Sequence, residues 1–201
     1  MKKIVAIATV AILSVGQASA QEGSFLSKVR LEAAYGYNMA LSPDNVERAD
    51  VSGLNTVQLG ANYQINNLWG VRGTYSNTTF KHKDFDNAGV NYNKLTAEAT
   101  FEVLQAISPS ESKFQLAAHT GFGINFGKSK ANDQKDNMGN FQIGLKPQYS
   151  ITDRIGVFLD GTYIMNFSQN MGYNGLSILG EESTTGSYVT GLIGVSFKLG
   201  Q

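Results

Sequence analysis

The segment Phe114-Gln-Leu-Ala-Ala-His-Thr-Gly-Phe-Gly-Ile-Asn-Phe126 carries the pattern that decides the fold. Counting from Phe114, every second residue is apolar except Thr120, and the residues between them are mostly polar or glycine. Successive side chains of a β-strand point to opposite faces, so this period of two predicts a strand with one apolar and one polar face. The segment is also longer than the usual five or six residues of globular strands.

The same alternation recurs in seven other segments of the chain, at residues 29–38, 56–65, 69–76, 94–103, 141–151, 157–166 and 188–199. In the last two, Phe158, Ile164 and Leu192 interrupt the polar phase. Apart from the eight residues of 69–76, the segments are ten to thirteen residues long, which matches the 9–11 residues that a tilted strand needs to cross a bilayer. The sequence therefore predicts eight strands of membrane-spanning length.

The connections between these segments alternate in length. Long polar stretches are expected near residues 39–53, 77–91, 127–140 and 168–187, and short turns at 66–67, 108–111 and 152–154. Outer-membrane barrels have short periplasmic turns and long extracellular loops. We therefore expect an all-β protein, an eight-stranded antiparallel up-and-down transmembrane β-barrel.

Period two alone does not say which face is inside, because a soluble lipocalin-like barrel would turn its apolar face inward. Three features favour the membrane. The apolar phase contains no charged residue, the polar phase is rich in Gly, Thr, Gln and Asn, and the aromatic residues of the apolar phase lie near the strand ends. Aromatic rings at two heights are typical of the girdles at the membrane interfaces. The predicted girdle residues are Tyr35, Tyr37, Tyr63, Trp69, Tyr75, Phe101, Phe114, Phe122, Phe141, Tyr149, Tyr163 and Phe197.

The N-terminus has the three-part pattern of a secretory signal peptide. Lys2 and Lys3 precede a largely apolar run, Ile4 to Val15, and a small-x-small cleavage site ends at Ala20. The apolar run is too short for a transmembrane helix. We therefore expect residues 1–20 to be a cleaved signal peptide and residues 21–201 to form the barrel domain, exported to the cell outer membrane.

The polar phase places eight titratable residues in the predicted lumen. Opposite charges in a low-dielectric interior must pair or be hydrated, so a charge network that fills the barrel is expected. Arg72 should approach Glu98 or Glu102, because their strands are neighbours. Lys94 and Lys198 share the phase but are expected at strand ends within reach of water. The predicted network consists of Arg30, Glu32, Arg72, Glu98, Glu102, His119, Lys146 and Asp160.

Catalytic and metal-binding signals are weak. The two histidines are His82 in a long connection and His119 on a strand, and no Gly-x-Ser-x-Gly occurs. The run Asp84-Phe-Asp-Asn-Ala-Gly89 begins like a calcium loop but lacks an acceptor at Ala88. The pair Gly121 and Gly123 lacks the third glycine of a dinucleotide-binding loop. The sequence thus predicts no enzymatic activity, no metal and no cofactor.

Composition narrows the function further. The chain has no Cys, which excludes disulfides and thiolate chemistry, and it has sixteen basic and sixteen acidic residues. No run of five like charges appears, so no nucleic-acid partner is expected. The connections at 81–91 and 128–137 contain little apolar surface, and we expect them to be mobile and exposed at the cell surface.

With its eight predicted strands, its girdles and its ending Gly194-Val-Ser-Phe-Lys-Leu-Gly200, the sequence resembles the OmpA/OmpX-type outer-membrane β-barrel family of Gram-negative bacteria. The resemblance implies an ion-pair network in the lumen and insertion by the barrel-assembly machinery. Many members end in an aromatic residue, whereas this chain ends Gly200-Gln201. Nothing follows Gln201, so the peptidoglycan-binding domain of OmpA proper is not expected.

The function expected from this resemblance is a structural or surface-interaction role. Its partners would be outer-membrane lipid, the barrel-assembly machinery and an extracellular ligand or host surface. A narrow, porin-like passive channel is the alternative, although eight strands leave little spare width in the lumen. A lipid-modifying outer-membrane enzyme is a third candidate.

Overall fold

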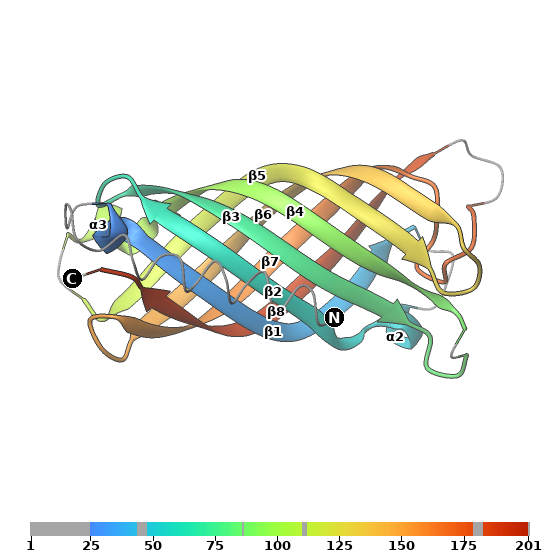
Figure 1. Cartoon of the computed structure of the whole chain (residues 1–201), viewed down its shortest axis with the longest axis horizontal. Helices are drawn as coiled ribbons and strands as arrows, with labels where there is room; N and C mark the ends of the chain where they lie inside the picture. The colour runs from blue at the N-terminus through green and yellow to red at the C-terminus, as the bar shows by residue number, and fades with distance from the viewer. Residues whose placement is uncertain (1–24, 44–47, 86, 110–111, 179–182, 201) are drawn as a thin grey trace.

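A computed structural model describes residues 25–43, 48–85, 87–109, 112–178 and 183–200 of the chain. It confirms a closed antiparallel barrel in which each strand is hydrogen-bonded to the next and β8 returns to β1 (Figure 1). The predicted signal peptide lies outside the described residues. The strands are β1 (Val29–Ser42), β2 (Gly53–Gln64), β3 (Trp69–Lys81), β4 (Gly89–Glu102), β5 (Phe114–Ser129), β6 (Lys135–Ser150), β7 (Ile155–Gln169) and β8 (Thr184–Lys198).

Short helical turns accompany the barrel at its two ends. The 3-10 turn η1 (Leu26–Lys28) precedes β1, α2 (Arg48–Val51) lies between β1 and β2, and α3 (Val103–Ile107) follows β4. Figure 1 places α3 at one end of the barrel and α2 at the other. Across the described residues, the helices are all too short to cross a bilayer.

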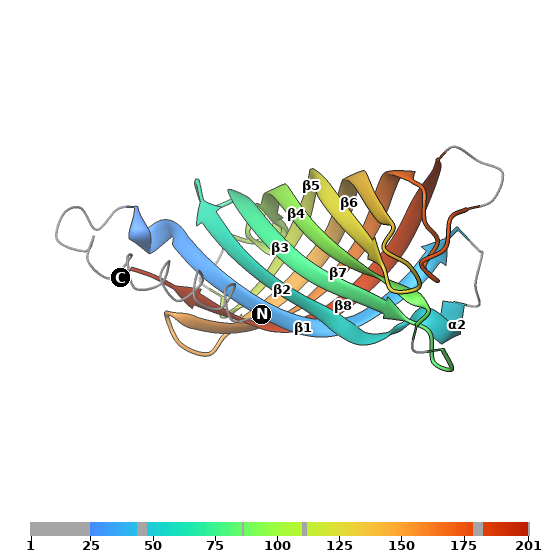
Figure 2. The same ribbon diagram turned by 45° about the vertical axis from the view of Figure 1, so that its right-hand side comes forward.

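The strands turn their apolar phase outward and their polar phase into the lumen, as predicted for a membrane barrel. Leu145 and Ile193 on the outer face are 53% and 64% exposed, whereas Gln142 on the inner face is 1% exposed. The turned view shows that the strands are strongly tilted to the barrel axis (Figure 2), as closure of a barrel requires. The outer surface is therefore an apolar wall that suits lipid.

The predicted girdle residues all lie on the outer face, where each is exposed or half-buried. Two pairs stand directly opposite each other on neighbouring strands. Trp69 contacts Phe101 with ring centroids 4.7 Å apart, and Phe122 contacts Phe141 at 5.1 Å. The first pair lies where β3 begins, whereas the second lies near the middle of the β5–β6 ladder.

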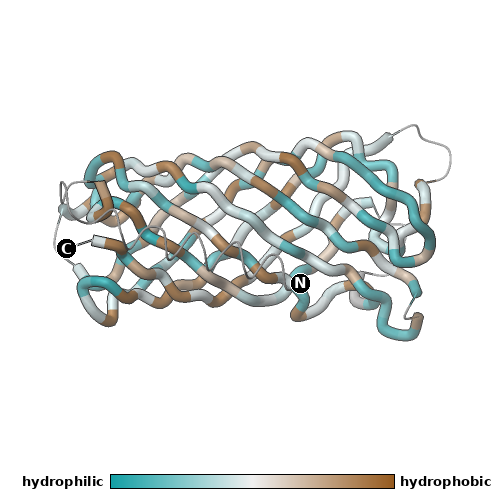
Figure 3. The backbone as a smooth tube through the Cα atoms, in the orientation of Figure 1, coloured by the Kyte–Doolittle hydropathy of each residue, from teal (hydrophilic) through white to brown (hydrophobic). Residues whose placement is uncertain are grey.

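The strands extend further than predicted on the long-connection side. Residues 77–81 and 89–91, assigned to a long connection, continue the β3–β4 ladder. On the outer face there, the amides of Asn77, Asn91 and Asn93 hydrogen-bond one another at 3.0–3.2 Å. On the inner face of the same part Phe80, Val90 and Tyr92 are buried, so the apolar residues change from the outer to the inner face although the backbone pairing continues. Figure 3 shows long hydrophilic stretches at this end of the barrel.

Most of the described residues in the segments 81–91 and 128–137 are exposed, as expected, but the ends of both segments belong to strands. Gly89 and Lys135 already begin β4 and β6, and β5 ends at Ser129. Val90 is fully buried and Asp136 is 2% exposed. These side chains point into the barrel, in the inward phase of their strands. The polar composition of the segments gave no alternation from which these strand ends could be predicted.

The connections at the opposite end are two tight turns and one longer segment. Asn66 Oδ1 accepts hydrogen bonds from the backbone N–H groups of Leu68 and Trp69 in the first turn, and Thr152 Oγ1 does so for Arg154 and Ile155 in the second. Side-chain acceptors of this kind stabilise tight turns.

The connection between β4 and β5 does not fit the prediction of a short turn at 108–111. It runs from Val103 to residue 113 and begins with the helix α3. The reason is that β4 and β5 are staggered relative to each other along the barrel. The last residue of β4, Glu102, pairs with Ala117, whereas β5 already begins at Phe114. The chain must therefore travel about 10 Å, at roughly 3.3 Å per residue, before β5 can begin.

Candidate functional site

Charged side chains in the middle of the lumen converge on Arg72 of β3. Its guanidinium lies 2.8 Å from Glu32 of β1, 2.9 Å from Asp160 of β7 and 3.4 Å from Glu98 of β4. All four side chains are at most 2% exposed. Glu98 stands directly opposite Arg72 on the neighbouring strand, whereas Glu32 and Asp160 come from strands that are not adjacent to β3. Arg72 therefore bridges the lumen from wall to wall.

His119 of β5 lies between two of these carboxylates. Its Nε2 is 3.1 Å from Asp160 Oδ1, and its Nδ1 is 2.7 Å from Glu98 Oε2, although the angles at Nδ1 depart from those of a regular hydrogen bond. The hydroxyl of Thr74 donates to Glu98 at 2.8 Å, and that of Thr162 donates to Asp160 at 2.7 Å. Each carboxylate thus has a cationic partner and a hydroxyl donor, which compensates part of the cost of its burial.

Lys146 of β6 extends this network toward the end of the barrel that carries the short turns. Its ammonium forms an ion pair with Glu32 Oε1, while Glu32 Oε2 accepts from Arg72. The ammonium also lies 5.2 Å from the ring centre of Phe158. The central network therefore joins Glu32, Arg72, Glu98, His119, Lys146 and Asp160.

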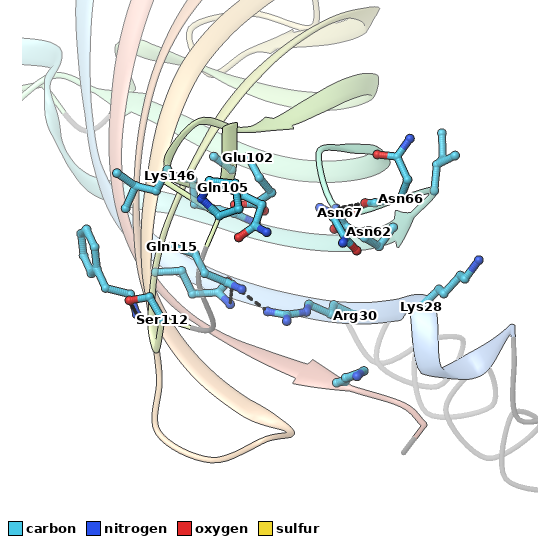
Figure 4. A pocket seen from close by; sticks show the side chains of 18 of the residues that line it. Lys28, Arg30, Asn62, Asn66, Asn67, Glu102, Gln105, Ser112, Gln115 and Lys146 are labelled. Atoms are coloured by element: carbon cyan, nitrogen blue, oxygen red, sulfur yellow. Dashed lines mark hydrogen bonds between the residues drawn. The ribbon is translucent and has the colours of Figure 1, made fainter. Parts of the chain in front are cut away.

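Arg30 and Glu102, the other two residues of the predicted network, lie outside this cluster. Arg30 Nη1 donates to Gln115 Oε1 at 3.3 Å. Both residues line a cavity of about 720 Å³ at the short-turn mouth of the barrel (Figure 4). The approach of Arg72 to a glutamate on β4 thus takes place at Glu98 and not at Glu102.

Two lysines of the inward phase differ in their surroundings. Lys198 is half-buried and lines the cavity at the short-turn mouth. The expectation that water reaches Lys94 is wrong, because it is 4% exposed and donates a hydrogen bond to Gln142. Its strand β4 begins at Gly89, so Lys94 lies inside the barrel and not at a strand end.

The mouth at the long-connection end contains an apolar cluster that sequence reasoning missed. Phe80, Tyr92, Tyr173 and Tyr188 are fully buried, with ring centroids 4.5–6.1 Å apart. Phe80, Tyr92 and Tyr188 occupy the inward phase close to strand ends, and that placement could have indicated them. Tyr173 belongs to the connection between β7 and β8, where no periodic signal exists. The cluster comprises Ala40, Val51, Phe80, Val90, Tyr92, Met138, Ile164, Met171, Tyr173 and Tyr188.

The segment that carries Met171 and Tyr173 is held in the mouth by hydrogen bonds. Asp136 accepts from the backbone N–H groups of Asn170 and Met171, at 2.7 and 3.1 Å. The hydroxyl of Tyr173 donates to the carbonyl of Ser187 at 2.7 Å. Burial, with Tyr92 and Tyr188 adding to it, raises the pKa of the Tyr173 phenol well above its usual value.

A glycine makes the fold of this segment possible. Gly175 has φ +81°, a conformation that residues with a side chain rarely adopt. A Cβ atom at this position would lie 2.2 Å from the carbonyl oxygen of Gly89. Hydrogen bonds hold this segment against its neighbours, since Gly89 N donates to Asn174 O at 2.8 Å and Ser129 Oγ donates to Gly175 O at 2.7 Å.

In the described residues, the two histidines lie neither beside a hydroxyl nucleophile nor in a cluster of metal-ligating side chains. Within the described residues, the ring nitrogens of His119 face carboxylates and not a hydroxyl group. His82 lies in the β3–β4 connection, where Nδ1 accepts from the backbone of Asp84 and Nε2 is 3.9 Å from Asp50. Across the same part of the chain, no three His, Asp or Glu side chains are gathered as around a metal ion.

Known proteins share this architecture. Neisserial surface protein A superposes with a TM-score of 0.58 at 16% identity, over 86% of this chain and 97% of that chain. The N-terminal barrel domain of OprF from Pseudomonas aeruginosa gives 0.51 at 12% identity, over 85% and 97%. A major outer membrane protein from Thermus thermophilus gives 0.51 at 14% identity, over 85% and 98%. At these identities the likeness shows the fold.

Sequence comparison identifies the family. Comparison with curated protein sequences gives no significant match. The profile of the outer membrane protein beta-barrel domain matches residues 8–178, which is most of the chain and includes β1 to β7. Together with the closed eight-stranded barrel and its apolar outer wall, this match places the protein in the outer membrane. The chain belongs to the outer membrane protein beta-barrel family.

Proposed function

We propose that this protein is a closed barrel with a structural or surface-interaction role in the outer membrane, and that its lumen is plugged. The observation that carries the proposal is the buried Arg72, whose guanidinium contacts carboxylates from three strands around the lumen. Ions that pass through the barrel would have to separate these pairs, which is strongly unfavourable in a low-dielectric interior. The apolar cluster at the other mouth adds a second constriction.

The surface-interaction part of the proposal is supported by apolar side chains at the long-connection end. Phe85 in the β3–β4 connection is 64% exposed, and Leu176 in the β7–β8 connection is 50% exposed. Both lie beyond the aromatic girdle, where a membrane would not cover them. In barrels of this kind the long connections face outward. An extracellular ligand or a host surface is therefore the proposed partner, and the barrel-assembly machinery the proposed route of insertion.

Conductance across a planar bilayer tests the plugged lumen. The purified mature protein should give no steady unitary current, whereas Arg72→Ala should give brief openings because three carboxylates lose their shared cation. Arg30→Ala, which changes the cavity at the mouth and leaves the central network in place, is the matched control. A steady ohmic current from the wild-type protein would refute the plug and favour the passive channel.

We infer further that the protein is not an enzyme. A lipid-modifying enzyme needs a nucleophile or an activated water beside a basic partner that the lipid can reach. His119 is 3% exposed and clamped by Glu98 and Asp160. Mass spectrometry of lipid A from cells with and without the protein tests this directly. A difference in acylation that His119→Ala or His82→Ala abolishes would overturn the inference.

A further inference from the structure

The cavity at the short-turn mouth lies outside the central network, and cationic and amide side chains line it. It has a volume of about 720 Å³. Residues of η1, β1, β2, β4, α3, β5, β6, β8 and the connections between them line it. Figure 4 shows Arg30, Glu102, Gln105 and Gln115 directed into the space between the strands. A volume of 300–1,000 Å³ is usual for sites that bind small molecules.

Positive charge dominates the walls of this cavity. Lys28, Arg30, Lys146 and Lys198 line it, and Glu102 is the acidic residue among the lining side chains. Lys146 is paired with Glu32 below the cavity. Lys28, Arg30 and Lys198 have no carboxylate within 4.0 Å in the described part of the chain. The cavity thus has an excess of cationic groups.

Two of these cations are placed side by side by the register of the barrel. Arg30 of β1 is the direct partner of Lys198 on β8, and on its other side it is the direct partner of Asn62 on β2. Side chains at such positions have Cβ atoms about 4.5–5.5 Å apart, and like charges directly opposite each other are destabilising. A bound anion between them would remove this repulsion.

The cavity also offers many neutral hydrogen-bonding groups. Asn62 is 7% exposed, and its Oδ1 has no hydrogen-bond partner among the described residues. Arg30 Nη1 is engaged by Gln115, which leaves most of the guanidinium donors available. Amide side chains can both donate to and accept from hydroxyl groups. The amides that line the cavity are Asn62, Gln64, Asn66, Asn67, Gln105, Gln115 and Gln148.

We propose that this mouth is a binding site for a small phosphorylated, hydroxyl-rich molecule of the sugar-phosphate class. The phosphate lies between Arg30 and Lys198, because the planar guanidinium matches the oxygens of a phosphate and an ammonium adds charge. The sugar hydroxyls contact the amides, and one of them donates to Asn62 Oδ1. The site goes beyond the proposed role of the barrel, since it requires neither a plugged lumen nor a surface partner.

Calorimetric titration of the refolded mature protein tests the proposal. The detergent should be tetraethylene glycol monooctyl ether, whose headgroup contains neither phosphate nor sugar. Glucose 6-phosphate should bind saturably, inorganic phosphate more weakly and glucose not measurably. Arg30→Gln and Lys198→Gln should each weaken binding of glucose 6-phosphate about tenfold or more, because each removes a charged donor.

Control variants separate the loss of a specific contact from a general loss of charge or of folding. Lys135→Gln removes one positive charge from an exposed residue at the opposite end of the barrel, and it should leave the affinity unchanged. Asn62→Leu should reduce the preference for glucose 6-phosphate over inorganic phosphate. Heat-modifiable gel mobility of each variant reports whether the barrel has folded. Absence of saturable binding, or an equal loss of affinity in Lys135→Gln, would overturn the site. Equal affinity for the two phosphates would overturn its assignment to sugar phosphates.

Discussion

Replacement of Arg72 by alanine should lower the free energy of unfolding by about 3–5 kcal/mol, the range for breaking a buried ion pair from one side. The substitution removes the cation that Glu32, Glu98 and Asp160 share and leaves these carboxylates buried. Lys146 still pairs with Glu32, and His119 still contacts the other two acids. This remaining compensation places the expected loss nearer the lower end of that range.

Urea unfolding in detergent micelles measures this loss, with the fluorescence of the single tryptophan, Trp69, as the signal. Trp69 lies on the outer face against Phe101, so its emission should change when the barrel leaves the micelle. Arg30→Ala is the matched control, because Arg30 occupies the same inward phase but hydrogen-bonds a neutral amide beside an open cavity. Its loss should stay below about 1.5 kcal/mol. If both variants unfold at the same urea concentration with equal slopes, Arg72 is solvated and the reasoning about the lumen fails.

Three further predictions concern the mouth, the topology and the N-terminus. Gly175→Ala should loosen the segment that closes the long-connection mouth and expose it to limited proteolysis, because the new Cβ would clash with the backbone of Gly89; Gly73→Ala, which has open space for a Cβ, should not. An epitope tag beside Asp133 should bind antibody on intact cells, whereas a tag in the turn at Asn66 should require a permeabilised outer membrane, and the reverse result would invert the topology. Mass spectrometry of the outer-membrane protein should find Gln21 as its first residue, and an intact N-terminus would disprove signal cleavage.

The barrel could be predicted from the sequence because its signal is local and repeated. Alternation in a segment such as Phe114–Phe126 shows within one strand which side chains share a face. Repetition eight times, with aromatic residues near the strand ends, leaves a membrane barrel as the natural interpretation. The exposure of Leu145 and Ile193 on the outer face and the burial of Gln142 inside agree with that interpretation.

The ends of the strands were harder to predict. Alternation of apolar and polar residues shows where one face of a strand meets lipid, but it does not show where the backbone hydrogen bonding between strands stops. Above the girdle the amides of Asn77, Asn91 and Asn93 hydrogen-bond one another on the outer face, whereas the inner face packs into the buried apolar cluster, so the apolar-out alternation ends there. The ladder therefore continues where the periodic signal has stopped. The helix α3 was missed for a related reason, since the length of its connection depends on the stagger between β4 and β5.

The inward phase of the predicted strands, and with it most of the charged residues that the lumen contains, follows from the order of the amino acids alone; Asp136, which lies where the alternation is lost, is an exception. Which of those residues meet depends on closure of the barrel. Glu98 is the register partner of Arg72 on the adjacent strand, but Glu32 and Asp160 are 40 and 88 residues away in sequence. Tyr173 is buried by a connection that folds back over the mouth. The tilt of the strands and the stagger between them set the height of every inward side chain along the barrel axis, and so decide which side chains meet across the lumen. Both are properties of the closed sheet, and no single strand encodes them.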